Sequence, residues 1–423
     1  MPDRLIKRTV FEQITKHISE PEMTVILGPR QTGKTTILSQ LKTYLTSNQI
    51  ANEKNILIFN LDFISDLELF KNQLDFFNYL KARIIANEKL YIFVDEAQRI
   101  ENAGIFFKGI YDKNLPIKFV LTGSSSLELK AKISEPLTGR KMIFNIYPFD
   151  FFEYLLAKDE FLAKLIYSDN ISDYDKKSLM NNLYDFIIYG GYPRIILEDN
   201  KEKKQHLLKE IYSSYIEKDI IGLLKIRNFS AYTKLLKIVA GQIGGLVNYH
   251  ELSKTTALSF RTIESYIGIL KQTFVIEDIR PFFKNTRKEL SKMPKIYFVD
   301  SGLRNFAISD FKNFKEREDR GSLLENYISS VFIKKQNRNT NFWRTKDKSE
   351  VDFVISLHDG EIIPLEVKAT ELISMEITRS FRNFISRYNP KQAFVANLSR
   401  QGEMIIDKTK INFILPYEIE RLF

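Results

Sequence analysis

The chain contains no cysteine, and this absence removes several kinds of chemistry at once. Disulfides, zinc sites built on thiolates and thiol nucleophiles are all excluded. The four histidines stand at positions 17, 206, 250 and 358, and this wide spacing matches no metal-binding motif. The composition therefore fits a reducing compartment, and we expect a cytoplasmic protein.

Long apolar runs are also missing. Runs such as 90–94 have the length of a strand, whereas about 20 residues are needed to span a bilayer. Residues 1–19 alternate charged and apolar side chains, which indicates an amphipathic helix rather than a signal peptide. We therefore expect no membrane association.

Positive charge is in excess and unevenly distributed. The 63 Lys and Arg outnumber the 53 Asp and Glu by 10, and this excess favours an anionic partner. Residues 220–299 alone hold 13 Lys or Arg and 5 Asp or Glu, so 13 − 5 = +8 of the excess lies there. With 423 residues and typical domains of about 150, two to four domains are expected.

Residues 23–41 read as a strand, a glycine-containing loop and a helix, and the loop matches the phosphate-binding pattern G-x-x-x-x-G-K-[ST]. Its backbone N–H groups and the positive end of the helix can surround phosphates, while Lys34 reaches the β- and γ-phosphates. Thr35 then offers its hydroxyl to Mg²⁺. We expect ATP and Mg²⁺ to bind here. The predicted nucleotide contacts are Gly28, Pro29, Arg30, Gln31, Thr32, Gly33, Lys34, Thr35 and Thr36.

A second apolar strand, within 89–99, ends in the acids Asp95 and Glu96. In a parallel α/β sheet, ligands collect at the carboxyl ends of the strands. Asp95 is expected to hold Mg²⁺, and Glu96 to polarise the water that attacks the phosphate.

A third strand, within 116–126, ends in serines, of which Ser124 or Ser125 could contact the γ-phosphate or the water. A plain turn or a helix N-cap explains the serines equally well. Further strands at 55–62 and 141–149 complete a three-layer α/β pattern over 23–149. Arg140 precedes the last strand and could be an arginine finger or could stabilise a loop.

Six segments, taken in order, resemble bacterial and archaeal ATPases of the AAA superfamily that carry a winged-helix region and a restriction-endonuclease-like C-terminal domain. They are GPRQTGKTT (28–36), FVDEAQ (93–98), LTGSSS (121–126), LTGR (137–140), YPFDFFEYL (147–155) and GGYPR (190–194). The resemblance covers nearly the whole chain. It implies that Arg140 and Arg194 are candidates for arginines that sense the nucleotide or contact a neighbour. A second copy or a partner protein could complete the ATP site.

The middle of the chain reads as two helical segments. Residues 150–220 have helical periodicity and are expected to form a lid over the nucleotide, although a helical connector would show the same pattern. Residues 229–283 predict three helices with a break at Gly244, an N-cap at Ser259 and two following strands, which is the order of a winged helix-turn-helix.

The third of these helices would read DNA, with Ile263, Ile267 and Leu270 in the core. A winged helix that contacts protein is the alternative. The predicted DNA contacts are Arg261, Thr262, Ser265, Lys271, Arg287 and Lys288.

The C-terminal segment shows the order helix, three strands, helix, strand, with Asp352 and then Glu366-x-Lys368, and so resembles the core of PD-(D/E)xK nucleases. Asp352 and Glu366 on neighbouring strands can converge on Mg²⁺, and Lys368 lies on the same strand face as Glu366. Glu325 is a candidate fourth member. Two alternatives remain. Lys368 could form only a surface salt bridge with either acid, or the domain could be an inactive nuclease-like fold that binds DNA or protein.

The expected fold is thus α/β, with a P-loop core at 1–149, a helical lid at 150–220, a winged helix at 221–305 and a nuclease-like domain at 306–423. The expected function is a Mg²⁺-dependent ATPase whose hydrolysis controls engagement of DNA by the other domains. The alternative is an ATP-switched regulator that does not cleave.

Overall fold

The computed structural model describes residues 5–85, 88–123, 137–215, 229–282, 293–335, 339–357 and 359–422. The chain forms two compact units. Unit 1 contains residues 1–148, 213–225 and 272–274, and unit 2 contains residues 149–212, 226–271 and 275–423. Among the residues named above, Ser124, Ser125, Arg287, Lys288 and His358 lie outside the described ranges.

Unit 1 is built on a five-stranded sheet of order β2-β3-β4-β1-β5, in which every neighbouring pair is parallel. Its strands are nearly continuous apolar runs, as expected where both sheet faces are covered. They are β1 (Met23–Leu27), β2 (Ile56–Asn60), β3 (Leu90–Asp95), β4 (Ile117–Gly123) and β5 (Lys141–Asn145).

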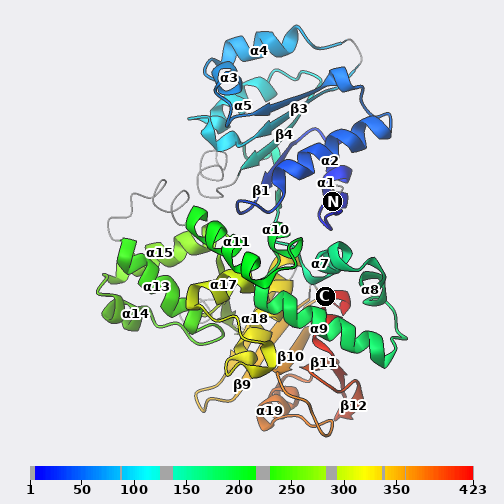
Figure 1. Ribbon diagram of the computed structural model, residues 1–423, viewed down its shortest axis with the longest axis vertical. Helices are drawn as coiled ribbons and strands as arrows, with labels where there is room; N and C mark the ends of the chain where they lie inside the picture. The colour runs from blue at the N-terminus through cyan, green and yellow to red at the C-terminus, as the bar shows by residue number, and fades with distance from the viewer. Residues whose placement is uncertain are drawn as a thin grey trace. The chain divides into compact units, whose positions relative to one another are not determined.

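Helices cover both faces of this sheet (Figure 1). Val25 and Leu27 pack with α4 (Gln73–Lys81) and α5 (Ala103–Tyr111), whereas Ile26 between them packs with α1 (Phe11–His17) and α2 (Lys34–Ser47). A short α3 (Ile64–Leu69) follows β2. The three-layer α/β core is therefore confirmed. The helix expected over 1–19 is shorter, because residues 5–8 run without helical structure toward the glycine loop.

Unit 2 begins with five helices. They are α7 (Phe151–Lys158), α8 (Glu160–Leu165), α9 (Asp173–Tyr189), α10 (Pro193–Ile196) and α11 (Lys201–Ser214). Asp159 divides the first two, because its carboxylate accepts hydrogen bonds from the N–H groups of Phe161 and Leu162 at 3.0 and 3.1 Å and so begins a new helix. These helices, predicted as a lid, belong largely to the same compact unit as the C-terminal sheet.

Three further helices and a hairpin follow. They are α13 (Phe229–Gly241), α14 (Tyr249–Thr256), α15 (Phe260–Gln272), β6 (Ile276–Pro281) and β7 (Lys295–Phe298). The predicted N-cap is confirmed, since Ser259 Oγ accepts the N–H of Thr262 at 3.1 Å. The predicted core residues Ile263, Ile267 and Leu270 are all buried.

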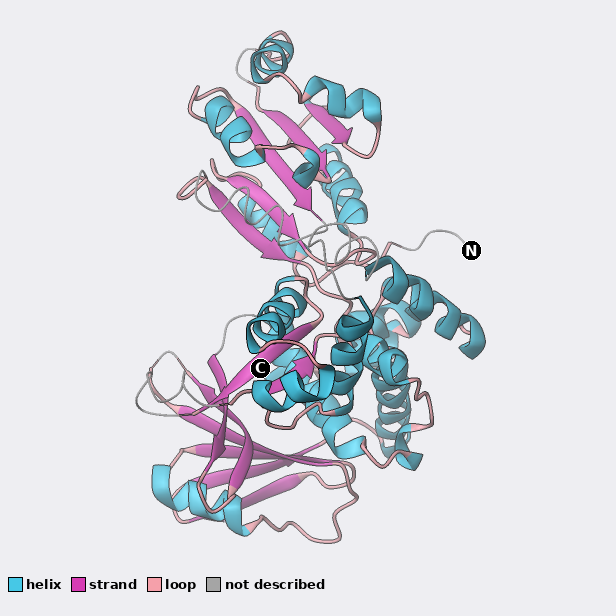
Figure 2. Cartoon of the chain, turned by 90° about the vertical axis from the view of Figure 1, so that its left-hand side faces the viewer, coloured by secondary structure: helices cyan, strands magenta, loops and turns pink. Residues whose placement is uncertain are grey.

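The C-terminal part of unit 2 is a mixed sheet of order β12-β13-β11-β10-β9-β8-β6-β7 (Figure 2). The hairpin β6–β7, expected as the wing of a separate domain, forms one end of this sheet because β6 pairs with β8 in parallel. The hairpin β12–β13 was not predicted. The remaining elements are α17 (Ser301–Ile308), α18 (Arg320–Lys335), β8 (Asn339–Arg344), β9 (Glu350–Ser356), β10 (Ile362–Lys368), α19 (Arg379–Tyr388), β11 (Gln392–Asn397), β12 (Gly402–Ile406), β13 (Thr409–Ile414) and α20 (Ile419–Leu422).

Among the described residues, we find no helix that is both long enough and apolar enough to cross a membrane.

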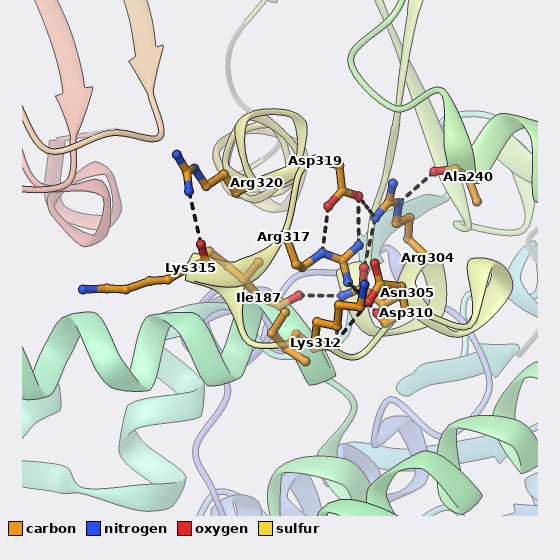
Figure 3. A network of polar contacts seen from close by, with 11 residues as sticks. Ile187, Ala240, Arg304, Asn305, Asp310, Lys312, Lys315, Arg317, Asp319 and Arg320 are labelled. Carbon is orange, nitrogen blue, oxygen red and sulfur yellow. Dashed lines mark hydrogen bonds and ion pairs between the residues drawn. The ribbon is translucent and has the colours of Figure 1, made fainter.

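A buried ion-pair network joins several helices of unit 2 (Figure 3). The side chains of Arg304 and Arg317 are almost fully buried, and both bind Asp319. Arg317 contacts Asp319 through two nitrogens, Nε at 2.7 Å and Nη2 at 2.8 Å, and Arg304 Nη1 lies 2.6 Å from the same carboxylate. Arg304 Nε also donates to the carbonyl of Ala240 in α13 at 2.7 Å.

The electrostatics of Asp319 follow from these contacts. Burial alone would raise its pKa, but the hydrogen bond from Arg317 and the positive charge of Arg304 outweigh burial, and the pKa is lowered. A lowered pKa means that the network stabilises the fold fully above the ordinary aspartate value of 3.8 and loses this contribution as the pH falls below it.

Replacing Asp319 with Ala should destabilise unit 2 by about 3 kcal/mol, because two buried guanidinium groups lose their shared partner. Urea unfolding of the full chain measures this free energy. The matched control is Glu371→Ala, which removes an exposed ion pair with Lys315 (3.7 Å) and should cost at most about 1 kcal/mol. Equal losses in the two variants would contradict the role given to Asp319.

Candidate active site

The glycine loop between β1 and α2 has a backbone that only certain residues can adopt. A Cβ atom placed on Gly28 would lie 2.1 Å from the carbonyl oxygen of Ile146, so a side chain cannot fit there. Gly33 has φ +92°, and Gln31 is left-handed with φ +61°. Strained backbone of this kind concentrates at functional sites. The loop is therefore held in a specific conformation by its neighbours in unit 1.

Two side chains at the loop, those of Thr32 and Lys34, donate hydrogen bonds to the loop's own backbone. Lys34 is buried, and its Nζ donates to the carbonyl oxygens of Gly28 and Pro29 at 3.0 and 2.7 Å. Thr32 Oγ1 donates to Pro29 O at 2.8 Å and closes the turn. Helix α2 begins at Lys34 and runs for 14 residues, so its N-terminal N–H groups and positive dipole end face the same place.

The two halves of the predicted metal site meet. Thr35 Oγ1 donates to Asp95 Oδ2 at 2.7 Å, across the 60 residues that separate them in sequence. A hydroxyl and a single carboxylate suit Mg²⁺, which usually keeps several waters and takes further oxygens from substrate phosphates. The donor set thus fits Mg²⁺ as the companion of a nucleotide.

Thr122, on β4, is a site residue that the sequence did not reveal. Strand β4 lies between β1 and β3, and this order places Thr122 beside Asp95. The Thr122 hydroxyl donates to Asp95 Oδ1 and accepts the N–H of Glu96 at 3.2 Å. The expected polar residue of this strand was Ser124, two positions later. The signal available was a threonine at the end of an apolar run that immediately precedes Gly123.

Glu96 follows directly at the end of β3. Its backbone is left-handed, with φ +58°, whereas Asp95 is the last residue of the extended strand. The side-chain amide of buried Gln98 donates to Glu96 Oε2. One carboxylate is thereby placed to bind metal and the other is held apart, as the two predicted roles require.

Arg8 is a second residue that the sequence did not reveal. Its buried guanidinium donates to the carbonyl of Thr32 in the glycine loop and to the carbonyl of Tyr147 after β5, both at 2.7 Å. A charged group on two carbonyls of distant segments fixes them relative to each other. Nothing in the local pattern around Arg8 indicates these partners.

The two predicted sensing arginines belong to different units, Arg140 to unit 1 and Arg194 to unit 2. The backbone oxygen of Arg140 pairs with Met23 at the start of β1, whereas the glycine loop follows the end of β1, so Arg140 is at the opposite edge of the sheet. Its side chain binds Asp112 at 2.8 Å, which supports the loop-stabilising alternative over contact with the nucleotide of its own unit. Arg194 belongs to unit 2, where it pairs with Glu210 at 3.4 Å, and its sensing role stays a prediction.

Helix α15 presents the predicted DNA-contacting residues unequally. Arg261 and Ser265 are exposed, on the side opposite the buried Ile263 and Ile267. Lys271 instead forms an ion pair with Asp278 of β6 and is partly buried, so its charge is already neutralised.

The hydroxyl of Thr262 lies 2.8 Å from that of Ser259 at the helix start. The structure thus leaves Arg261 and Ser265 as the accessible members of the described set.

The C-terminal carboxylates share one face of the sheet. Continuing the antiparallel register of β9 and β10 by one residue beyond Phe353 and Leu365 places Asp352 opposite Glu366. Lys368 Nζ lies 2.7 Å from Glu366 Oε1, and Asp352 Oδ2 accepts the N–H of Val367 at 2.8 Å. Burial and, next, the charge of Glu325 raise the pKa of Asp352 to about 8.

Three residues outside the predicted set complete this cluster. Lys295 of β7 is buried and lies 2.6 Å from Glu350 and 3.5 Å from Glu325, while Tyr297 donates its hydroxyl to Glu325 at 2.9 Å. Burial alone would lower the pKa of Lys295, but Glu325, Asp352 and Glu350 outweigh it and raise the pKa. Within the described ranges, no three or more acidic or histidine side chains are grouped so that they could hold a metal ion.

Comparison with known proteins supports the reading of unit 1. A family model described as an AAA domain matches residues 20–155. Residues 180–315 and 320–419 match two models described as domains of unknown function, DUF8612 and DUF4143. The expectation of an AAA-type P-loop ATPase is confirmed at the level of the domain family, whereas the winged helix and the nuclease-like domain stay predictions.

Similar proteins extend over most of the chain. The uncharacterized protein MJ1544 of Methanocaldococcus jannaschii is 30% identical over 354 residues, which cover 80% of this chain and 73% of that protein. An uncharacterized protein of Haemophilus influenzae is 26% identical over 85% of this chain and 86% of its own length. Among solved structures, a Walker-type ATPase of Pyrococcus abyssi gives a TM-score of 0.43 at 15% identity, with 72% of this chain and 96% of that chain covered.

Replacing Thr122 with Val keeps the shape of the side chain but removes the hydroxyl from Asp95 and from the N–H of Glu96. We expect the kcat of ATP hydrolysis to fall about 10- to 100-fold with little change in KM, because the lost contacts orient the acids rather than the phosphates. Steady-state ATPase kinetics measure both constants. Thr122→Ser retains the hydroxyl and should retain activity; an equally inactive serine variant would contradict the assignment.

Proposed function

Because this chain belongs to the same protein family as MJ1544 and matches an AAA domain over residues 20–155, we propose that it binds Mg·ATP, hydrolyses it, and uses this cycle to control DNA engagement by unit 2. The observation that carries the ATPase part is the continuous set of contacts from Thr35 through Asp95 and Thr122 to Glu96. It links the phosphate-binding loop to an acid that could act on water.

Each residue would have a separate task. The N–H groups of the loop and the ammonium of Lys34 bind the phosphates and orient the γ-phosphate. Thr35 and Asp95 would hold Mg²⁺, which supplies positive charge to the phosphate oxygens in the transition state. Glu96, oriented by Gln98, accepts the proton of the attacking water. Arg8 keeps the loop in position throughout.

Glu96→Gln should lower the kcat of ATP hydrolysis about 10²- to 10⁴-fold and leave ATP binding nearly unchanged, because only the proton acceptor is lost. Turnover of ATP and equilibrium binding of a fluorescent ATP analogue test the two halves of this statement. Glu101→Gln, an exposed acid a few residues away, is the matched control and should be fully active. Undiminished turnover in Glu96→Gln would remove the proposed role.

For DNA, the supporting observations are the order of α13, α14, α15 and the hairpin β6–β7, together with the +8 excess of residues 220–299. This order is that of a winged helix, whose third helix enters the major groove. The exposed side of α15, with Arg261 and Ser265, would face the DNA. Because Lys271 and Arg280 both pair with Asp278, we assign less of the binding to them.

Arg261→Gln should weaken duplex DNA binding and reduce the slope of log affinity against log salt concentration by about one, because one phosphate contact is lost. Fluorescence anisotropy at several salt concentrations measures both quantities. Arg83→Gln, an exposed arginine of unit 1, should bind as wild type does. An unchanged salt slope in Arg261→Gln would contradict the placement of DNA on α15.

The C-terminal carboxylates support two candidate functions. Metal-dependent phosphodiester cleavage is favoured by the shared face of Asp352, Glu366 and Lys368, and would appear as DNA cleavage in Mn²⁺ that is lost in Asp352→Ala and in Lys368→Ala. A non-cleaving binding domain is favoured by the protein donors that each of the two carboxylates already has. The surroundings of Lys295, an ammonium among acids, favour the second function.

A further inference from the structure

Backbone pairing on both sides of its strand fixes the position of Lys295 beside the C-terminal carboxylates. Lys295 lies on β7, where its backbone pairs with Ile279 of β6 on one side and with Leu246 on the other. The side chain is only 2% exposed. Its ammonium lies 2.6 Å from Glu350 Oε1 and 3.5 Å from Glu325 Oε2.

The four acids of the cluster all accept from protein donors. Glu325 accepts from Tyr297, and Asp352 from the backbone of Val367. Both oxygens of Glu366 are within 3.1 Å of the Thr378 hydroxyl, and one is 2.7 Å from Lys368. Glu350 binds Arg344 at 3.0 Å in addition to Lys295.

This arrangement does not fit a resident divalent cation. Mg²⁺ requires several oxygen atoms at about 2.1 Å in octahedral geometry, and each of them must have a lone pair directed at the ion. Here ammonium groups already lie beside the acids, Lys295 beside Glu325 and Glu350 and Lys368 beside Glu366, and their positive charge opposes the binding of a cation. The described residues also contain no acid or histidine group of three that could bind a metal. The cluster instead contains three cationic side chains, Lys295, Arg344 and Lys368, beside four acids, Glu325, Glu350, Asp352 and Glu366.

We propose that Lys295 is the built-in counter-cation of Glu325 and Glu350, and that this ammonium, rather than a divalent metal, balances the negative charge of the C-terminal carboxylate cluster. The C-terminal domain is then a binding domain and not a metal-dependent nuclease. This inference does not depend on ATP hydrolysis by unit 1 or on the residues assigned to it.

The position of Gly244 indicates that the same cluster also holds neighbouring segments of unit 2 together. Gly244 is left-handed, with φ +73°, and a Cβ placed on it would lie 3.0 Å from Glu325 Oε2. The loop between α13 and α14 therefore closes directly on the carboxylate that Lys295 and Tyr297 hold. One charged cluster thus connects the loop between α13 and α14, the hairpin β6–β7 and helix α18 within unit 2.

The first test is Mn²⁺ binding to the full-length chain without nucleotide, by isothermal titration calorimetry. Wild type and Asp352→Asn should give superimposable isotherms, because no ion binds at Asp352 in either protein. A Mn²⁺ site that is present in wild type and lost in Asp352→Asn would overturn the proposal. Any binding at Thr35 and Asp95 is common to both proteins and cancels in this comparison.

The second test removes the ammonium. Lys295→Ala should melt at least about 6 °C lower than wild type, because the acids lose their buried partner, and Mn²⁺ should partly restore its melting temperature. The restoration should vanish in Lys295→Ala/Asp352→Asn. Lys410→Ala, which removes an exposed ion pair with Glu403, is the control and should melt as wild type does in the presence and absence of Mn²⁺.

Lys295→Arg keeps the positive charge and should fold and melt close to wild type even where the alanine variant fails to fold. A wild-type melting temperature in Lys295→Ala, or a folded Lys295→Ala protein that Mn²⁺ does not stabilise, would show that the ammonium does not occupy a cation position. Either result would overturn the proposal.

Discussion

The candidate active site of unit 1 depends on one constraint, namely that parallel strands end at the same edge of their sheet. Strand β4 lies between β1 and β3, so the ends of these three strands deliver Gly28, Thr122 and Asp95 side by side although they are far apart in sequence. Thr35, the second residue of α2, directly follows the glycine loop and therefore reaches Asp95. The chemistry of the site thus follows from strand order, and no long active-site loop is required to assemble it.

Unit 2 depends on a different constraint, the cost of an unpaired charge inside a protein. Arg304 and Arg317 are both buried, and Asp319 binds both, while Asp310 is a second acidic partner of Arg317. Lys295 is buried under the same condition, with Glu325 and Glu350 as its partners. In each case the partners come from different segments, so the charges also determine which helices and strands pack together.

The parts that could be predicted are those whose reason is local. The glycine loop, Asp95 and Glu96 each follow an apolar strand directly, and the elements from 320 to 397 show clear periodicity. The hairpin β12–β13 was missed because β12 alternates between partly buried and exposed residues at the sheet edge. Thr122 and Arg8 were missed because their partners are set by long-range pairing; Arg8 contacts Tyr147 across 139 residues. Lys295 contributed only positive charge to the sequence-based prediction, because the sequence does not show that the hairpin β6–β7 joins the sheet beside β8.

The same long-range contacts determine when the nucleotide site can form during synthesis. Strand β1 emerges early, but it pairs with β5, and Leu27 accepts a hydrogen bond from the N–H of Ile146 next to the glycine loop. Arg8 likewise cannot donate to the carbonyl of Tyr147 until that residue has been synthesised. Since a nascent chain folds from its N-terminus as it is made, the loop lacks its supporting partners until the end of β5 has left the ribosome. A chain that stops before residue 141 would contain the complete phosphate-binding motif without the edge strand and carbonyl that shape it.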